Sequence, residues 1–202
     1  MHKVFISFHH LDQIYKDWLV NLNNQNHIFI DKSVNTGGIA EHLPDQSIRQ
    51  IIRDDYLQDT TVTIVLVGRN TKGRKHVDWE IYSSMYDGVR NKRSGVVVIL
   101  LPEGNPNNNW VAAHENEKVE LYPGYFDWFD LNTRQEYENR FPFMPDRLLE
   151  NLVENNVKIS VAPWDRINAD TLRTLLDNAY LVRERNQYNL QSRMRRANSP
   201  LI

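Results

Sequence analysis

The sequence predicts an α/β fold in which a five-stranded parallel sheet is covered by helices on both faces. Short, nearly continuous apolar runs such as Val62–Val67 and Val96–Leu101 are typical of strands that are buried on both sides. Segments with helical periodicity separate these runs, and they supply the crossover connections that neighbouring parallel strands need. The composition is that of a globular protein, with 41% hydrophobic and 25% charged residues among 202.

The first half of the chain alternates between strand and helix patterns. Val4–Phe8 is short, apolar and rich in β-branched and aromatic residues, which predicts a buried strand. A helix should follow, because apolar residues recur at helical spacing at Ile14, Tyr15, Trp18, Leu19 and Leu22. Ile28–Ile30 predicts a second strand, and a polar loop at 32–44 leads to another helical stripe at 48–56.

The second half repeats the alternation after a long interruption. The strand Val62–Val67 is followed by a helix at about 76–86, and the strand Val96–Leu101 is closed by Pro102. Order returns with a helix at 145–154, a strand at 157–161 and a final helix from about Ala169. The resulting five strands predict a flavodoxin-like architecture, and the polar residues from Arg193 onward are expected to fray.

The chain is expected to form one domain at 1–190, followed by a polar C-terminal tail at 191–202. Residues 102–143 are interpreted as an insertion after the fourth strand, since an irregular segment of this length is more often functional than a plain connection. Its aromatic residues could cover a ligand pocket, form an interface or pack as a small core of their own: Trp110, Tyr122, Tyr125, Phe126, Trp128 and Phe129.

Composition also narrows the function classes. The formal net charge of −2 gives no reason to expect nucleic acid as a partner. The sequence contains no cysteine, which rules out disulfides, thiolate metal sites and a cysteine nucleophile. The chain opens on a strand-like run and has no apolar stretch near the ~20 residues that span a bilayer. We therefore expect a cytoplasmic protein with no membrane association.

In an open parallel sheet, ligands bind beyond the carboxyl ends of the strands, near the point where the strand order reverses. Three classes of protein that commonly have this architecture do not match the sequence at the ends of its predicted strands. A dinucleotide-binding domain needs a glycine-rich turn after its first strand, but residues 8–11 contain no glycine. A flavodoxin needs small hydroxyl residues there to hold phosphate, and a phosphoacceptor domain needs an Asp at the end of the third strand, where this chain has Val67 and Gly68.

Glu80 is the candidate catalytic residue on the predicted helix at 76–86. Val77, Ile81, Ser84 and Met85 share the side that faces the sheet, which places Glu80 at the edge of the buried stripe. A carboxylate in that position is partly desolvated and can still reach a cleft, so it can serve as a general base or polar anchor. On position alone, a solvated glutamate at the rim remains the alternative.

Three segments resemble TIR domains. Lys3–His9 is similar to their opening strand and the loop after it, and Thr61–Gly68 with Val77–Ile81 is similar to their third strand and following helix. The resemblance covers residues 3–101 and is closest to the bacterial branch that includes the NAD⁺-processing subunit of Thoeris anti-phage systems. Many TIR domains have a tryptophan several residues before the catalytic glutamate, whereas Trp79 is directly adjacent to Glu80.

The resemblance implies an enzyme that cleaves the nicotinamide–ribose bond of NAD⁺, with Glu80 as the catalytic carboxylate and NAD⁺ as substrate rather than cofactor. It further implies an ADP-ribose-derived signal, made by hydrolysis, cyclisation or transfer, that activates a downstream effector. Self-association into homo-oligomers through the loop at 32–44 also follows from it. The matching substrate-binding positions are Phe5, Ser7, Phe8, His9, Asp31, Lys32, His76 and Trp79.

No metal site is expected. His9 and His10 are neighbours in an extended segment, where successive side chains point in opposite directions. A basic cluster before the helix could meet a pyrophosphate or could be a solvated loop, and it comprises Arg69, Lys72, Arg74 and Lys75.

Two other functions remain open at the level of sequence. A non-enzymatic TIR-like adaptor would act by self-association and could retain Glu80 for structural reasons. An enzyme similar to nucleoside deoxyribosyltransferases would share the architecture and the carboxylate-assisted cleavage, but it would act on free nucleosides.

Overall fold

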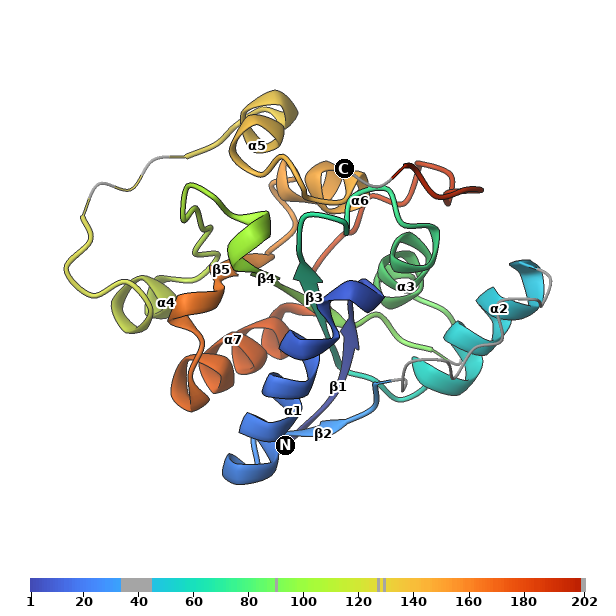
Figure 1. Cartoon of the computed structure of the whole chain (residues 1–202), viewed down its shortest axis with the longest axis horizontal. Helices are drawn as coiled ribbons and strands as arrows, with labels where there is room; N and C mark the ends of the chain where they lie inside the picture. Colours follow the sequence, from blue (N-terminus) through green and yellow to red (C-terminus); the bar gives the residue numbers. More distant parts are fainter. Residues whose placement is uncertain (34–44, 90, 127, 129, 201–202) are drawn as a thin grey trace.

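A computed structural model shows a central sheet between two layers of helices (Figure 1). The structure describes residues 1–33, 45–89, 91–126, 128 and 130–200, so the predicted loop at 34–44 and Phe129 fall outside the described residues. The five parallel strands have the order β2-β1-β3-β4-β5. They are β1 (His2–Ser7), β2 (Phe29–Asp31), β3 (Val62–Val67), β4 (Gly95–Leu100) and β5 (Ser160–Pro163). The predicted α/β class with a five-stranded parallel sheet is confirmed.

The helices divide between the two faces of the sheet (Figure 1). One face is covered by α1 (Gln13–Asn26) and α7 (Ala169–Val182). The other is covered by α2 (Asp45–Ile51), which continues into the π-helix η2 (Ile52–Tyr56), and by α3 (Lys75–Met85) and α6 (Asp146–Leu152). The remaining elements are η1 (His10–Asp12), η3 (Pro102–Gly104), α4 (Glu115–Glu120), α5 (Arg134–Arg140) and η4 (Trp164–Arg166).

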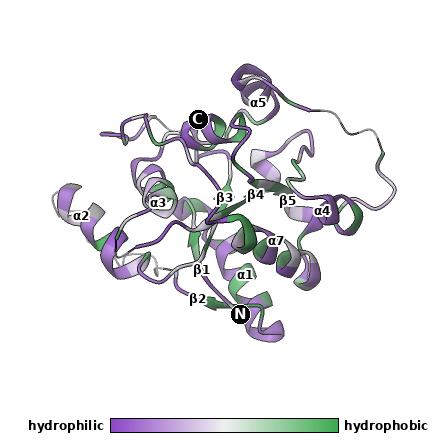
Figure 2. Cartoon of the chain, turned by 180° about the vertical axis from the view of Figure 1, so that it is seen from behind, coloured by the Kyte–Doolittle hydropathy of each residue, from purple (hydrophilic) through white to green (hydrophobic). Residues whose placement is uncertain are grey.

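Side chains of β1 alternate between the two cores. Val4 and Ile6 pack beneath α1 and α7, whereas Phe5 packs with Trp79 of α3 on the opposite face. Figure 2 shows the strands as predominantly hydrophobic and α2 and α5 as largely hydrophilic. The alternation matters for function because Ser7, two residues after Phe5, points to the same side as α3.

Helix α7 lies directly on β4 at Gly95. A Cβ atom at position 95 would collide with the backbone carbonyl of Ala179, so a side chain there would push the helix off the sheet. The sequence expectation placed this strand at Val96–Leu101, whereas the ladder begins one residue earlier, at this contact.

Helix α1 exists as predicted, but it is rotated relative to the expected apolar face. Leu19 is fully buried, whereas Ile14 is 73% exposed and Trp18 is 42% exposed. The Asn23 side-chain oxygen accepts hydrogen bonds from the backbone amides of Ile28 and Phe29 at 3.0 and 2.7 Å. Those bonds bury Asn23 and fix the rotation of the helix, which turns Ile14 and Trp18 outward.

The last strand lies later in the chain than 157–161. Val157 and Ile159 are buried in the core beneath α3 and α6, but pairing with β4 begins only at Ser160, opposite Val97. The prediction that this apolar run is buried is therefore confirmed. The prediction that the strand begins at Val157 is wrong, because pairing with β4 starts at Ser160. Between β4 and α6 the chain forms η3, α4 and α5, and Val111 of this segment makes an isolated antiparallel bridge to Val161 of β5.

Candidate functional site

Ser7 and Glu80 meet between the end of β1 and the second turn of α3. The Ser7 hydroxyl donates a hydrogen bond to Glu80 Oε2 at 2.6 Å. Ser7 is fully buried, whereas Glu80 keeps part of its surface in contact with solvent. The expected position of Glu80, at the edge of the buried stripe of its helix, agrees with this arrangement.

The environment of Glu80 changes its acidity. Burial disfavours the charged form and raises the pKa of the Glu80 carboxyl to about 7, while the hydrogen bond from Ser7 opposes that rise. The pKa of this carboxyl group therefore lies close to neutral pH. A carboxyl with this property can accept a proton or present a negative charge without a large free-energy difference between its two states.

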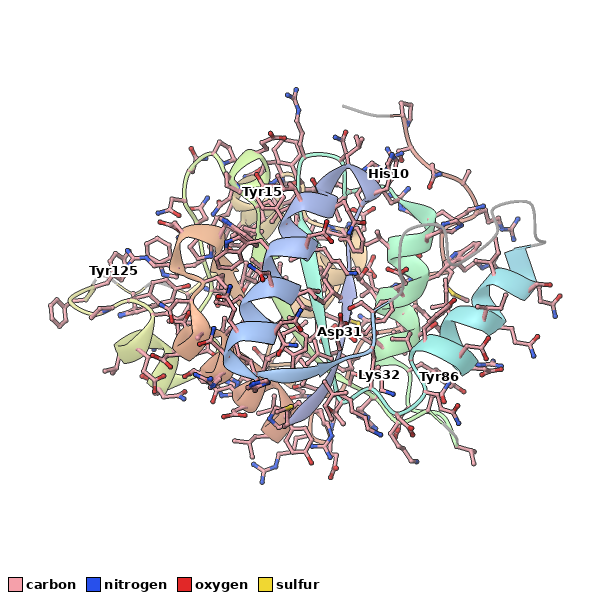
Figure 3. All side chains as sticks on the ribbon, turned by 60° about the horizontal axis from the view of Figure 1, so that its bottom comes forward. His10, Tyr15, Asp31, Lys32, Tyr86 and Tyr125 are labelled. Carbon is pink, nitrogen blue, oxygen red and sulfur yellow. The ribbon has the colours of Figure 1, made fainter. Side chains whose placement is uncertain are left out.

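The chain segment after β2 is tied to the same end of β1. The Lys32 amide donates to the Val4 carbonyl at 2.8 Å, and the Ser33 hydroxyl accepts from the Ile6 amide at 3.1 Å. Asp31 fixes this turn, because its Oδ1 accepts from the Ser33 amide at 2.8 Å. Asp31 and Lys32 are both exposed beside β1 (Figure 3), and Asp31 is in register with Val4, so the two residues lie beside the middle of the strand.

Phe5 and Trp79 form the wall behind the Ser7–Glu80 pair. Both are essentially fully buried in a cluster with Ile48, Ile52 and Leu57. The Trp79 indole N–H donates to the Arg195 carbonyl at 2.8 Å. Both residues were expected to contact a substrate, but in this conformation their rings offer a ligand almost no surface and instead support the residues that are closer to solvent.

The remaining candidates are distributed around this wall. Phe8, immediately after β1, is half-buried against the core beneath α1 and α7. His76 lies in the first turn of α3, with its ring centroid 5.2 Å from that of Trp79. Phe8 and His76 therefore lie on opposite sides of β1 and do not form one wall of a pocket.

His9 is buried, and its ring lies 4.2 Å from that of His10, between centroids. Burial, together with smaller contributions from the nearby His10 and Arg74, lowers the pKa of His9 to about 4. His9 is thus a neutral imidazole at physiological pH. Its Nδ1 accepts the Leu11 amide at 3.4 Å, a long hydrogen bond at the start of η1.

Asp12 forms a second acidic feature at the carboxyl ends of β1 and β3. Its carboxyl group is buried, and burial together with nearby Glu103 raises its pKa to about 6. A Cβ atom at Gly68 would lie 2.7 Å from both carboxyl oxygens, so a side chain there would displace the Asp12 carboxyl group from this position.

The C-terminal segment was expected to fray, and this expectation is wrong for residues 193–200. The Arg195 carbonyl accepts the Trp79 indole N–H, and the Asn198 side chain accepts the Lys75 amide at 2.8 Å at the start of α3. The Arg74 guanidinium donates to the Ser199 carbonyl at 2.6 Å. The tail therefore lies across the first turn of the helix that carries Glu80.

A buried ion pair anchors the same helix. Arg147 of α6 donates two hydrogen bonds to the Asp78 carboxylate at 2.8 and 3.2 Å, and both side chains are almost fully buried. The Arg195 amide donates to the same carboxylate at 2.8 Å. Asp78 precedes Glu80 by two residues, so this network holds the backbone of the candidate site. No sequence pattern pointed to it, because its members are 69 and 117 residues apart.

A groove of about 470 Å³ runs between α2, α3 and the tail, and its size is in the range of ligand pockets. Ser83 lines it and lies three residues from Glu80, which makes the two side chains neighbours on the helix surface. Its other lining residues are Gln46, Gln50, Arg53, Tyr82, Tyr86 and Met194.

Two further findings concern the described part of the chain. Its His, Asp and Glu side chains do not gather in any group of three that could hold a metal ion. None of its helices has the length and apolar character required to cross a membrane.

A family model described as "Thoeris protein ThsB, TIR-like domain" matches residues 5–106, about half of the 202-residue chain. The matched region includes Ser7 and Glu80 and ends after β4. No curated protein matches the chain.

Proposed function

This chain belongs to the Thoeris ThsB family of TIR-like domains, and from that premise we propose that it cleaves the nicotinamide–ribose bond of NAD⁺ with Glu80 as the catalytic carboxylate. The observation that carries the proposal is the Ser7–Glu80 pair, in which a carboxyl with a pKa near 7 lies at the edge of the core. Family membership implies a role in Thoeris defence, which is the context of the proposed reaction.

The chemistry suits an isolated carboxylate. Departure of nicotinamide builds positive charge on the ribose, as in other N- and O-glycosidic cleavages. An ionised Glu80 would stabilise that charge or hold the ribose hydroxyls, and in a partly desolvated position its effect is stronger than in water. Ser7 keeps the carboxylate in one orientation, because the hydroxyl donates to a fixed oxygen at 2.6 Å.

The residues around Ser7 and Glu80 would bind the substrate or support the site. The exposed Asp31 and Lys32 lie beside the middle of β1 and would contact the polar parts of the dinucleotide that extend from the site, while the neutral His9 would interact without adding charge. Phe8 and His76 would contact the substrate from opposite sides of β1. Phe5 and Trp79 would not contact it but would support Ser7 from behind. No metal or cofactor is required for this reaction class.

We further propose that the product is an ADP-ribose derivative that activates a downstream effector in the cytoplasm, and that self-association accompanies activation. The chain would form one domain at 1–190, with the insertion at 102–143 and the tail at 191–202. Hydrolysis, cyclisation and transfer are all compatible with one carboxylate, so the product is identified by experiment.

The test is incubation of purified protein with NAD⁺, with products separated by chromatography and identified by mass spectrometry. Wild-type protein should release nicotinamide, and Glu80→Gln should abolish the release. Glu184→Gln is a matched control, because Glu184 is exposed and pairs with its neighbour Arg183 at the surface. The same variants are compared in phage-infected cells, since a defence enzyme can require an infection signal.

Three outcomes would argue against the proposal. Nicotinamide release that persists in Glu80→Gln would remove the assigned role of this residue. Base release from free nucleosides, but not from NAD⁺, would favour a deoxyribosyltransferase-like enzyme. Defence in infected cells that is unaffected by Glu80→Gln, together with no NAD⁺ loss, would favour the adaptor.

A further inference from the structure

The groove between α2, α3 and the C-terminal tail has the size of a ligand site. Its volume of about 470 Å³ falls within the ~300–1,000 Å³ of small-molecule pockets, which combine aromatic walls with a few polar groups. The two helices lie on the same face of the sheet (Figure 1), and each supplies one wall. Ser7 and Glu80 are not among the residues that line the groove, so it is distinct from the site described above.

One wall of the groove carries two tyrosine rings. Tyr82 and Tyr86 lie one turn apart along α3, and their rings are nearly parallel, at 13° with centroids 6.1 Å apart. The Arg147 guanidinium lies 4.9 Å from the centre of the Tyr82 ring and covers part of it. Tyr86, at the end of α3 beside α2 (Figure 3), is 45% exposed. The Tyr86 ring therefore offers a surface on which a planar ligand can stack.

The opposite wall presents two glutamine side chains. Gln46 and Gln50 lie one turn apart on α2, so they share one side of that helix. Both are exposed, and neither side chain makes a hydrogen bond to any residue that the structure describes. A glutamine amide has an acceptor oxygen and two donor hydrogens, so this wall offers both kinds of hydrogen-bonding group to a ligand.

The charge of the groove favours a neutral ligand. Arg53 is the one charged side chain among the described residues that line it. Its guanidinium already donates two hydrogen bonds to the Asp54 carboxylate, at 2.6 and 2.8 Å. A phosphate would have to compete with Asp54 for Arg53, whereas an uncharged ring would not. The groove is therefore suited to a planar, neutral group with hydrogen-bonding atoms along its edge.

The backbone of the glutamine wall is fixed from its inner side. Ile48 and Ile52 are buried in one cluster with Trp79, which attaches α2 to the core beneath α3. Directly after α2 the chain continues as the π-helix η2, and π-helical turns are rare and frequently occur at functional sites. The two walls are thus held in place before a ligand arrives, which lowers the entropic cost of binding.

We propose that this groove binds adenosine, either free or as part of a larger nucleotide whose charged groups remain outside. The adenine ring stacks on Tyr86, and its N6 donor and N7 acceptor pair with the amide of Gln46 or Gln50 in bidentate geometry. Guanine presents two acceptors, N7 and O6, along the same edge, and these suit arginine rather than glutamine. Binding of adenosine here requires no cleavage of NAD⁺.

The test is calorimetric titration of the full chain with adenosine, guanosine and AMP. Adenosine should bind saturably with a dissociation constant at or below ~1 mM, and guanosine should bind at least about tenfold more weakly. AMP distinguishes the two sources of the nucleoside. An affinity for AMP within about threefold of that for adenosine shows that the groove accepts adenosine as part of a nucleotide, and AMP binding more than about tenfold weaker shows that it takes free adenosine.

Variants locate the site. The double variant Gln46→Leu, Gln50→Leu should weaken adenosine binding about tenfold and remove the preference over guanosine. Tyr86→Leu should weaken it about tenfold, because stacking is lost. The double variant Gln25→Leu, Gln135→Leu is the matched control, since both are exposed helical glutamines, on α1 and α5, away from the groove. The control should leave the affinity unchanged.

The substituted glutamines and Tyr86 are all exposed, so the variants should fold, and circular dichroism verifies each one. Glu80→Gln should leave adenosine affinity unchanged, which separates the groove from the proposed catalytic site. The proposal is overturned if adenosine does not bind saturably, or if the double glutamine variant and Tyr86→Leu both bind it as the wild type does. AMP binding without adenosine binding would assign recognition to the phosphate, and adenosine binding that is lost in Glu80→Gln would place the nucleoside at the other site. Either result overturns the proposal and leaves nicotinamide release, which is measured separately, unaffected.

Discussion

Replacement of Glu80 with glutamine is expected to stabilise the fold while removing the proposed activity. Glutamine has nearly the same shape, and its side-chain oxygen can accept the same hydrogen bond from Ser7. It cannot ionise, so the variant avoids the free-energy cost of a partly buried negative charge. A residue that reduces stability in its ionised form is typical of a site in which function and stability conflict.

The magnitude follows from the pKa. The Glu80 carboxyl titrates near 4.5 when unperturbed and at about 7 in the folded protein. Because the folded state holds its proton more tightly, the wild type loses stability as the pH rises from the unperturbed value through about 7. Each unit of pKa corresponds to about 1.4 kcal/mol, so the cost at pH 8 is about 3 kcal/mol, and it is below about 1 kcal/mol at pH 5.

The measurement is urea unfolding of wild type and Glu80→Gln at pH 5 and pH 8, in one buffer system of constant ionic strength. The variant should gain about 2 kcal/mol more at pH 8 than at pH 5, an upper figure since a partly exposed carboxyl is also solvated by water. Glu184→Gln, at an exposed position, should change stability by less than about 0.5 kcal/mol at both. An equal change at both pH values, or a larger loss at pH 8, would refute the reasoning.

Three more predictions concern the groups around Glu80. Ser7→Ala removes a hydrogen bond that favours the ionised carboxylate, so the pH at which nicotinamide release reaches half its maximum should rise by about one unit; an unchanged or lower midpoint would contradict the role of Ser7. Asp78→Asn leaves Arg147 buried without its carboxylate and should cost about 3–5 kcal/mol in urea unfolding, against less than about 1 kcal/mol for Asp59→Asn, which breaks an exposed pair with Lys3. Deletion of residues 193–202 removes the acceptors of the Trp79 indole and the Lys75 amide, so hydrogen exchange should accelerate in a peptide covering 73–80 but not in one covering β4; unchanged exchange in both would show that the tail does not hold α3.

The sheet could be predicted because parallel strands that are buried on both faces are recognisable in the sequence as short, continuous apolar runs. Val62–Val67 is a run of six residues, all buried, and its predicted and observed bounds coincide. Prediction was weaker where apolar residues are buried without being paired, as at Val157 and Ile159. It was weakest for the rotation of α1, because that rotation is set by the hydrogen bonds of Asn23 to the chain beyond the helix, and not by the positions of Ile14 and Trp18.

In the candidate site too, features set by the local sequence could be predicted and features set by distant parts of the chain could not. The phase of α3 predicted Glu80 at the edge of its buried face, whereas Ser7 was a candidate only through the resemblance of residues 3–9 to TIR domains. The pattern did not distinguish Trp79 as a buried support from Trp79 as a ligand contact. That difference arises from the tail, whose polar residues 193–200 have no periodicity and are ordered by hydrogen bonds to α3.

The parts of the chain that identify the family and the parts that hold the site are therefore different. The matched region at 5–106 contains Ser7 and Glu80, but Arg147 and Arg195, which bind the Asp78 carboxylate, lie outside it. A fragment limited to the matched region would keep the carboxylate and lose both of these donors to Asp78. Such a fragment should therefore be unable to hold α3 in place, so the family signature alone does not suffice for the geometry on which the proposed chemistry depends.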